Sequence, residues 1–517
     1  MGHVDLTRRA FLAGSLAVAG AALAPPRAAA VSPPDLDFAS ALDVGRAIRA
    51  GKVSSLELTT RMLDRIQQYN GKINAIVTLA GDAVDRARAA DQALARREIR
   101  SPLHGVPCTI KDTFEVAGVT TTAGAPELRN HVPARDATVV ARLRDAGMVV
   151  LGKSNVPLYA FDWQSYNAVY GQTNNPWDVT RTPGGSTGGG AAALAAGLTY
   201  LEPGSDLAGS IRIPASFCGV YGHKPSLDVV PLRGHIPPPP GIPATPPSTL
   251  AVAGPLARSA ADLRAALEIL GGPDGDEARA WRWSLPPARG ARLADYRIGY
   301  VLDHPLCPVS PEVGDALAAT VEALRKAGAQ LTEGWPAGVN VEEQFDAYYA
   351  LLIARYGQPV REDQIPGLRQ RAAIQDGSYL ARYALAATAS DAYMRTMEIR
   401  RRQARGVWQA YFRTSDAFLL PTALVPAFPH DPVGTPLMRV LATPRGERPY
   451  PDLCFWISFA SLAGLPATSA PVGLTPVGLP VGIQIVGPYL EDATPIDLAG
   501  RLADVIGGFR PPPGFGA

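Results

Sequence analysis

The sequence has few cysteines and no metal-binding motif. Only four occur among 517 residues, and none stands in a CxxC pair: Cys108, Cys218, Cys307 and Cys454. This spacing excludes a zinc or iron–sulfur signature and a disulfide-rich scaffold, although one or two disulfides would be compatible with export. The seven histidines are scattered and form no HExxH motif. We therefore expect no metal site built on histidine or cysteine.

An excess of charge and long apolar runs are also missing. Lys plus Arg number 49 and Asp plus Glu 47, which excludes a general electrostatic attraction to nucleic acid or acidic membranes. After the first 30 residues, no apolar run reaches the roughly 20 residues that a membrane-spanning helix needs. We expect no nucleic-acid partner and no stable membrane insertion of the mature chain.

Residues 1–30 have the features of an export signal. Arg8 and Arg9 precede a weakly apolar run of about 14 residues, and Ala28 to Ala30 follow as a small-residue cleavage site. Paired arginines before such a run are typical of twin-arginine signals, which carry folded proteins across the membrane. We predict that residues 31–517 form the mature chain and that it works in the periplasm or outside the cell.

Glycine and proline, by contrast, are abundant, with 51 and 49 residues, and predict many structured turns. Helical patterns alternate with short apolar strands, which favours an α/β fold. No internal repeat or linker is evident, so one large domain is expected over 31–517. The expected helices are a capped one from Ser54 to about Tyr69, then 82–97, 137–146, 257–270, 311–328 and most of 341–412. The expected strands are 105–112, 148–151, 297–302, 467–472 and 481–486, and a stretch with eight prolines, 231–247, is expected to be an extended surface loop.

Two serine–glycine segments are the candidates for chemistry. They read TPGGSTGGG at 182–190 and GSDLAGSIRIPA at 204–215. Glycine permits close backbone approach, and several amides near a serine can hold a developing oxyanion. A phosphate cradle is disfavoured because the GxxxxGK[ST] lysine and the GxGxxG spacing are missing. An α/β-hydrolase elbow would need a strand directly before Ser186, where the sequence instead predicts a turn.

The third alternative is a serine nucleophile activated by a second serine and a lysine. A neutral lysine can accept a proton, whereas arginine effectively cannot. Lysine is scarce here, with six residues against 43 arginines. Lys111 is expected at the end of a strand, and the other candidates are Lys52, Lys72, Lys153, Lys224 and Lys326.

Several ordered blocks of residues 35–505 resemble the amidase signature family. The strongest is 184–215, and the others are GVP at 105–107 with IKD at 110–112, GQTNNPWD at 171–178, FCGVYGHKP at 217–225, LAGLPA at 462–467 and GLPVGIQ at 478–484. The resemblance implies a single α/β/α domain with a central mixed β-sheet covered by helices. It implies no metal, nucleotide or organic cofactor.

The same resemblance implies a Ser–cis-Ser–Lys triad. Ser210 would be the nucleophile, Ser186, on a cis peptide after Gly185, would relay its proton, and Lys111 would be the base. For this role the pKa of Lys111 must be lowered by burial. We expect the neighbouring Asp112 to point away or to bond to the backbone, and Lys153 to have a supporting role. The implied oxyanion hole consists of backbone amides of Leu207, Ala208, Gly209 and Ser210. Where the family often has glycine and serine, this chain has Ala208 and Thr187, and we expect these differences to affect the shape of the acyl pocket and not the activity.

Further side chains around these segments are given supporting or binding roles. Asp206 and Arg212 are expected mainly to hold the nucleophile loop, with Gly185 and Thr187 supporting the first serine. An aromatic cluster supplies candidate pocket residues, namely Tyr159, Phe161 and Trp163, and the region 341–412 is the other candidate wall.

These features predict an exported serine amidohydrolase, monomeric or homodimeric, that cleaves small or medium amides, including aryl amides. Ester or carbamate hydrolysis is expected as a side or main activity. Two alternatives stay open: the glutaminase subunit of an amidotransferase, which the export signal and balanced charge disfavour, and a non-catalytic exported binding protein on the amidase scaffold.

Overall fold

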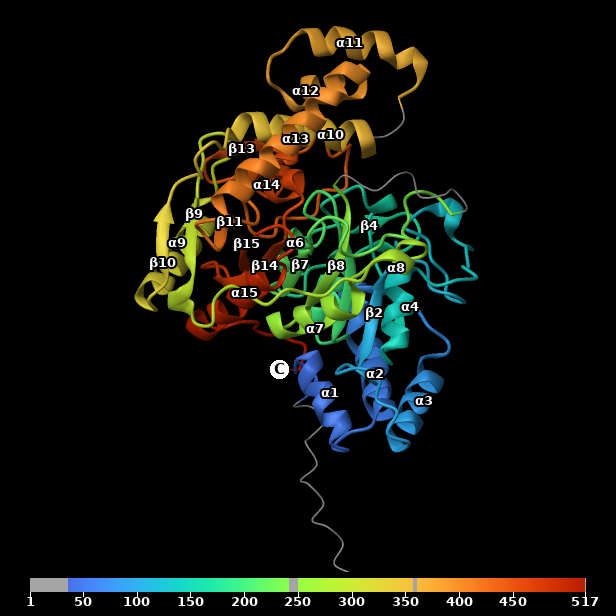
Figure 1. Cartoon of the computed structure of the whole chain (residues 1–517). Coiled ribbons are helices and arrows are strands. Elements are labelled where there is room, and N and C mark those ends of the chain that lie inside the picture. The colour runs from blue at the N-terminus through green and yellow to red at the C-terminus, as the bar shows by residue number, and fades with distance from the viewer. Residues whose placement is uncertain (1–35, 241–249, 357–359, 517) are drawn as a thin grey trace, which may run out of the picture.

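The computed structural model describes residues 36–240, 250–356 and 360–516. The predicted export signal, 1–30, lies outside the described residues. At the centre lies a mixed sheet of eight strands (Figure 1). In spatial order these are β10 (Gln330–Glu333), β9 (Arg297–Tyr300), β11 (Ala417–Pro421), β15 (Pro480–Val486), β14 (Ala467–Leu474), β7 (Tyr221–Lys224), β8 (Val252–Ala257) and β6 (Leu201–Asp206).

The sheet is parallel on one side and antiparallel on the other. β9 pairs in parallel with β10 and with β11, and every other neighbouring pair is antiparallel. A second sheet has the order β1 (Ile76–Leu79), β3 (Val149–Ser154), β2 (Pro107–Lys111). Its β2 lies against β6, so the end of β2 meets the end of β6. Two short hairpins complete the strands: β4 (Tyr166–Asn167) with β5 (Gly171–Gln172), and β12 (Val440–Thr443) with β13 (Gly446–Pro449).

Helices flank the central sheet in two groups. α7 (Ala260–Leu270), α9 (Pro311–Lys326) and α15 (Ala493–Ile506) pack on the sheet together, and so do α5 (Gly188–Ala195) and α6 (Arg212–Cys218). The N-terminal part of the described chain contributes four more helices: α1 (Ala41–Arg49), α2 (Ser55–Ile73), α3 (Ala83–Ala95) and α4 (Thr138–Asp145). α8 (Glu277–Ala280) is a single short turn. This arrangement confirms the predicted α/β fold with a central mixed sheet covered by helices.

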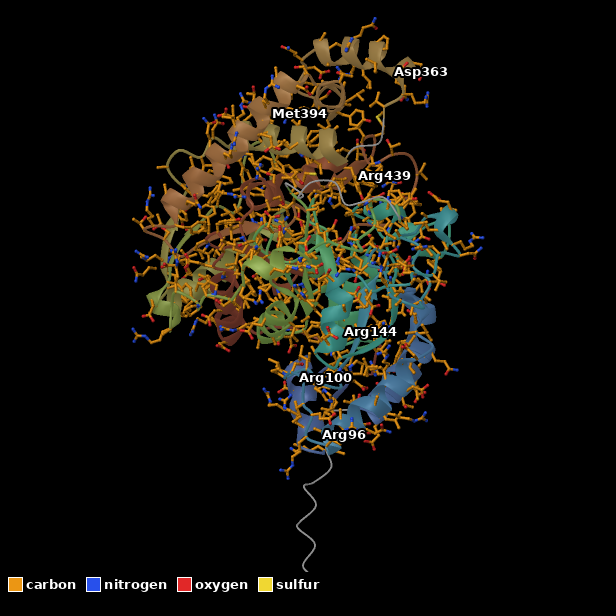
Figure 2. All side chains as sticks on the ribbon, turned by 45° about the vertical axis from the view of Figure 1, so that its right-hand side comes forward. Arg96, Arg100, Arg144, Asp363, Met394 and Arg439 are labelled. Atoms are coloured by element: carbon orange, nitrogen blue, oxygen red, sulfur yellow. The ribbon has the colours of Figure 1, made fainter. Side chains whose placement is uncertain are left out.

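A helical layer stands over one end of the sheet. It comprises α10 (Val341–Tyr356), α11 (Ile365–Ala373), α12 (Tyr379–Ala387), α13 (Asp391–Tyr411) and α14 (Phe455–Ala463). α11 and α12 extend furthest from the sheet, at the top of Figure 1. In Figure 2, Asp363 marks the approach to α11 and Met394 lies near the start of α13. α10 packs on both α13 and α14, which connects this layer to the rest of the core.

Several elements form where the sequence predicts them. The expected capping box is present: Ser54 accepts from the amide of Glu57, and the Glu57 side chain accepts from the amide of Ser54. Lys111 is the last residue of β2, as expected. Among the strands that were not predicted are β6, β7, β8 and β11. Glycine, proline or charged residues interrupt the apolar pattern of the first three, and β11 is a short run that ends in proline. All four are buried by pairing within the sheet.

The described part of the proline-rich stretch, 231–240, is a loop as predicted, and Ile236 is its one buried residue. The amide of Ile236 donates to the carbonyl of Thr113 at 2.7 Å. Residues 241–249 are outside the described part. The four cysteines are all buried and free. Within the described ranges no helix is long and apolar enough to cross a membrane.

Candidate active site

Lys111 is fully buried at the end of β2, with its ammonium group among hydroxyl and carbonyl oxygens. Its Nζ lies 2.7 Å from Ser186 Oγ, 2.9 Å from Ser205 Oγ and 3.4 Å from the Ser205 carbonyl oxygen. Burial lowers the pKa of Lys111 to about 7, against the opposing attraction of Asp206 and Glu202. A large share of this lysine is therefore neutral at neutral pH.

Asp112 points away from this lysine. Its carboxylate accepts from the Thr122 amide at 3.1 Å and from the Thr122 hydroxyl at 2.6 Å. Lys153 Nζ lies 3.4 Å from the same carboxylate and also donates to Thr121 Oγ1 at 3.0 Å. These contacts confirm the expectation that Asp112 bonds to backbone, and they place Lys153 in support of Asp112.

Ser186 follows Gly185 in a tightly packed loop, and only glycine fits at position 185. The peptide bond between Gly185 and Ser186 is cis, as the family resemblance implies. A Cβ at Gly185 would lie 2.6 Å from the Asp162 carbonyl oxygen, so no larger residue is accommodated there. The next amide, of Thr187, donates to the carbonyl oxygen of Ser210 at 3.1 Å. This bond ties the first serine segment to the second.

Ser210 lies in the turn between β6 and α6, and Asp206 and Arg212 fix that turn. Asp206 accepts from the amides of Gly209 at 3.0 Å and Ile211 at 3.2 Å. Arg212 pairs with Asp206 through two nitrogens and gives its other N–H groups to Ser461 and to oxygens of Ile457 and Gln484. All five guanidinium donors are thus used within the protein. Both residues hold the loop, and Arg212 has no donor left for a substrate.

The predicted oxyanion hole requires one correction. The amide of Gly209 already donates to Asp206, so it is not free for an oxyanion. The amides of Leu207, Ala208 and Ser210 have no hydrogen-bond partner among the described residues. These three remain the candidate donors.

Two aromatic side chains hold the carbonyl groups of the same loop. The Tyr348 hydroxyl donates to the Leu207 carbonyl at 3.2 Å, and Trp163 Nε1 donates to the Ala208 carbonyl at 2.6 Å. In a trans peptide the C=O and the following N–H point in opposite directions. Fixing the Leu207 carbonyl on Tyr348 therefore turns the amide of Ala208 the other way. No role was predicted for Tyr348, because an apolar helical stretch carries no local signal that shows which of its rings contacts the loop.

The hydroxyl groups of Ser186 and Ser210 are not hydrogen-bonded to each other among the described residues. Catalytic hydrogen bonds are often long without substrate and shorten when it binds. Sequence reasoning also missed Ser205, which contacts Lys111 directly and lies inside the recognised motif but was not singled out there.

A cavity of about 700 Å³ opens beside Ser210. Its walls are mostly apolar and combine the 157–168 segment, the 207–210 turn, helices α10 and α12 and the 435–437 loop. Phe161 and Trp163 line it as predicted, but Tyr159 is not among the lining residues, and its hydroxyl donates to Glu127 at 2.6 Å. Tyr349, Leu352, Ile353 and Tyr383 form the wall that the 341–412 region was expected to supply.

One charged side chain, Asp162, borders this cavity, and it is already paired. It accepts from Arg439 at 2.6 Å and from the Tyr450 hydroxyl at 2.6 Å. Arg439, labelled in Figure 2, also bonds to the carbonyl of Val433 at 3.0 Å. This cluster attaches the 433–439 segment to the cavity wall and leaves no free charge among the described lining residues.

Comparison with known proteins agrees with this geometry. The family model described as Amidase matches residues 57–495. One of the curated relatives is a glutamyl-tRNA(Gln) amidotransferase subunit from Deinococcus radiodurans. It is 34% identical over 501 residues, which cover 90% of this chain and 97% of the relative.

Solved structures give the same result. Peptide amidase from Stenotrophomonas maltophilia has a TM-score of 0.70 and 28% identity, over 93% of this chain and 99% of its own. A structure described as a vestigial complex that reveals the origins of an s-triazine catabolic enzyme has a TM-score of 0.75 and 28% identity, over 92% and 100%. The chain therefore belongs to the amidase signature family of amide-hydrolysing enzymes.

Proposed function

We propose that this enzyme hydrolyses small or medium amides carrying an apolar or aryl group, through an acyl-enzyme on Ser210. The observation that carries the proposal is the 2.7 Å contact between Ser186 Oγ and a buried lysine whose pKa lies near 7, beside a cavity that Ser210 lines. A neutral amine at this distance is placed to take the proton of a hydroxyl.

The reaction consists of two acyl transfers. The Ser210 oxygen attacks the amide carbon while its proton passes to Ser186, and the Ser186 proton passes to Lys111. The C–N bond then breaks, and the proton returns along the same path to the leaving amine. Water attacks the resulting ester in the same way and releases the acid. Free amides of the 207–210 turn would bind the oxyanion in both steps.

The substrate class follows from the cavity lining. Phe161, Trp163, Leu352 and Ile353 offer apolar surface, and Asp162, the only charged residue in the described lining, is neutralised by Arg439. An apolar or aromatic substituent gains free energy on entering such a space, whereas an unpaired charge loses it. Esters with the same acyl group would form the same acyl-enzyme, and carbamates would form a carbamoyl- or alkoxycarbonyl-enzyme on Ser210. We propose no role for a nucleic acid, and the enzyme would act as a monomer or homodimer.

A second candidate is the glutaminase subunit of an amidotransferase. The 34% identity to an amidotransferase subunit from Deinococcus radiodurans favours it. Against it, free glutamine carries an ammonium and a carboxylate, and the described lining offers neither a free cation nor a free anion. The predicted export signal also argues for a protein that works outside the cytoplasm. A third candidate, a binding protein without turnover, is weakened by the presence of Lys111, Ser186 and Ser210 together.

A hydrolysis panel tests the proposal. Wild type and Ser210→Ala would be assayed on a primary amide, an anilide, a peptide amide, an ester, a carbamate and glutamine. Turnover of the apolar substrates that disappears in Ser210→Ala supports the proposal. Hydrolysis of glutamine alone would favour the amidotransferase candidate. Tight binding of amides without turnover would favour the binding protein.

Export is proposed on the sequence of residues 1–30 alone. Cell fractionation of a native producer, with wild type beside an Arg8→Lys, Arg9→Lys double variant, tests it. Mature protein outside the cytoplasm, lost in the double variant, is the expected result. Equal cytoplasmic retention of both forms would contradict it.

A further inference from the structure

A chain of hydrogen bonds continues beyond Lys111 to His235, which has no role in the function proposed above. Ser205 Oγ lies 2.9 Å from Lys111 Nζ and 2.9 Å from His235 Nε2. The other ring nitrogen, Nδ1, lies 3.3 Å from the carbonyl oxygen of Pro237. Lys111 and Ser205 are buried, and His235 is partly exposed.

The position of His235 is fixed by contacts other than that with Ser205. The next residue, Ile236, is buried and donates its amide to the Thr113 carbonyl at 2.7 Å. The imidazole packs edge-on against the ring of Phe114, with 4.8 Å between centroids. The segment of His235 and Ile236 is therefore held against Thr113 and Phe114, which follow β2 and Lys111 closely in the chain.

The partners determine the direction of each hydrogen bond. The carbonyl oxygen of Pro237 can only accept, so the imidazole proton sits on Nδ1 of His235. In a neutral ring Nε2 is then an acceptor, and the bond at 2.9 Å must be donated by the Ser205 hydroxyl. Because the Ser205 hydroxyl donates its hydrogen bond to His235, Ser205 Oγ accepts a hydrogen bond from an N–H of Lys111.

The donors and acceptors around Lys111 also determine where its lone pair points. A neutral amine has two N–H groups and one lone pair, and both the hydroxyl and the carbonyl of Ser205 act as acceptors toward it. The third neighbour, Ser186 Oγ at 2.7 Å, is then left facing the lone pair. We propose that His235 is a positioning residue that acts through Ser205 to turn the lone pair of Lys111 toward the Ser186 hydroxyl.

Partial burial lowers the pKa of His235 below its ordinary value, which favours the neutral ring. Without an acceptor at 235, the Ser205 hydroxyl is free to donate to the lysine nitrogen instead. It would then compete with Ser186 for the one lone pair that the reaction needs. The inference rests on the proposed role of Lys111 as the base.

The test is a double-mutant cycle between positions 235 and 205. His235→Phe keeps an aromatic ring against Phe114 but removes the acceptor, and His235→Gln restores an acceptor oxygen. Ser205→Ala removes the hydroxyl that would otherwise compete. Each single variant, and His235→Phe combined with Ser205→Ala, would be compared with wild type in kcat, KM and melting temperature on the best substrate of the hydrolysis panel.

We expect His235→Phe to lower kcat by roughly 10- to 100-fold with KM within about threefold, since a base that is wrongly oriented for most of the time loses part of its contribution. His235→Gln should recover part of that loss. In the Ser205→Ala background, His235→Phe should cause no further loss beyond about twofold. His304→Phe, a histidine replacement that leaves Lys111 and Ser205 untouched, is the matched control and should keep wild-type kinetics.

Other results overturn the inference. A His235→Phe effect of the same size in both backgrounds would mean a structural role, and a change in KM alone would mean a role in binding. If His235→Phe does not fold, equal kcat in His235→Gln and His235→Ala would reject the need for an acceptor. Failure of the proposed function is separate, because it appears as activity that persists in Lys111→Met and Ser210→Ala.

Discussion

The protonation of Lys111 predicts how the activity depends on pH. Only the neutral amine can accept the Ser186 proton, and burial brings its pKa from 10.5 to about 7. At pH 7 about half of the lysine is then neutral, roughly 1,500 times the fraction expected at the ordinary pKa. Because neutral lysine increases as pH rises, kcat/KM should increase through pH 7.

The magnitude follows from the titration. Below about pH 6, kcat/KM should fall about tenfold for each pH unit, and above about pH 8 it should level off. The assay is release of the amine from an uncharged anilide between pH 5 and 9 at constant ionic strength, with Ser210→Ala as the blank. A profile that is flat across this range, or one still rising steeply at pH 9, would refute the reasoning.

Glu202 supplies the control for this assignment, because its pKa is raised by burial to about 7 and it titrates in the same window. Its carboxylate accepts from the hydroxyls of Thr109 and Ser154, both at 2.5 Å. It also raises the pKa of Lys111 by attraction. Glu202→Gln should therefore move the rise in kcat/KM to lower pH. If the rise instead disappears, Glu202 and not Lys111 is the titrating group.

Three further variants test the loop and the cavity. Tyr348→Phe removes the donor to the Leu207 carbonyl and should lower kcat about 5- to 10-fold with little change in KM, measured by steady-state kinetics; unchanged kcat would show that this bond does not orient the loop. Arg439→Gln leaves Asp162 buried without its ion pair, a cost of about 3–5 kcal/mol that should appear as a clearly lower melting temperature, and an unchanged one would contradict the account. Leu352→Ala should raise KM about tenfold for substrates with large apolar groups and leave a small amide such as acetamide unaffected; equal changes for both would place Leu352 outside the binding surface.

The sequence predicted the fold class and the central motif because both depend on local patterns. The capping box at Ser54, the strand ending at Lys111 and the glycine-rich serine segments are readable from neighbouring residues. Strands β6 and β8 were missed, since their glycines and prolines weaken the apolar signal and their register is set by pairing with each other.

The parts of the site that could not be predicted depend on long-range contacts. Tyr348 reaches the Leu207 carbonyl from 141 residues away, and His235 reaches Ser205 from 30 residues away. Neither has a local signal, because an aromatic ring in a helix and a histidine in a proline-rich stretch are each compatible with many positions. Likewise, the pairing of the Gly209 amide with Asp206 depends on the exact turn after β6.

The central claim is that Ser210 carries the acyl group, and trapping that intermediate tests it most directly. The enzyme would be mixed with a slowly hydrolysed ester or carbamate, quenched in acid, and examined by intact mass spectrometry followed by peptide mapping. The account predicts an added mass equal to the acyl group on the peptide containing Ser210, and no adduct in Ser210→Ala. An adduct on another residue, or turnover that continues in Ser210→Ala, would contradict it.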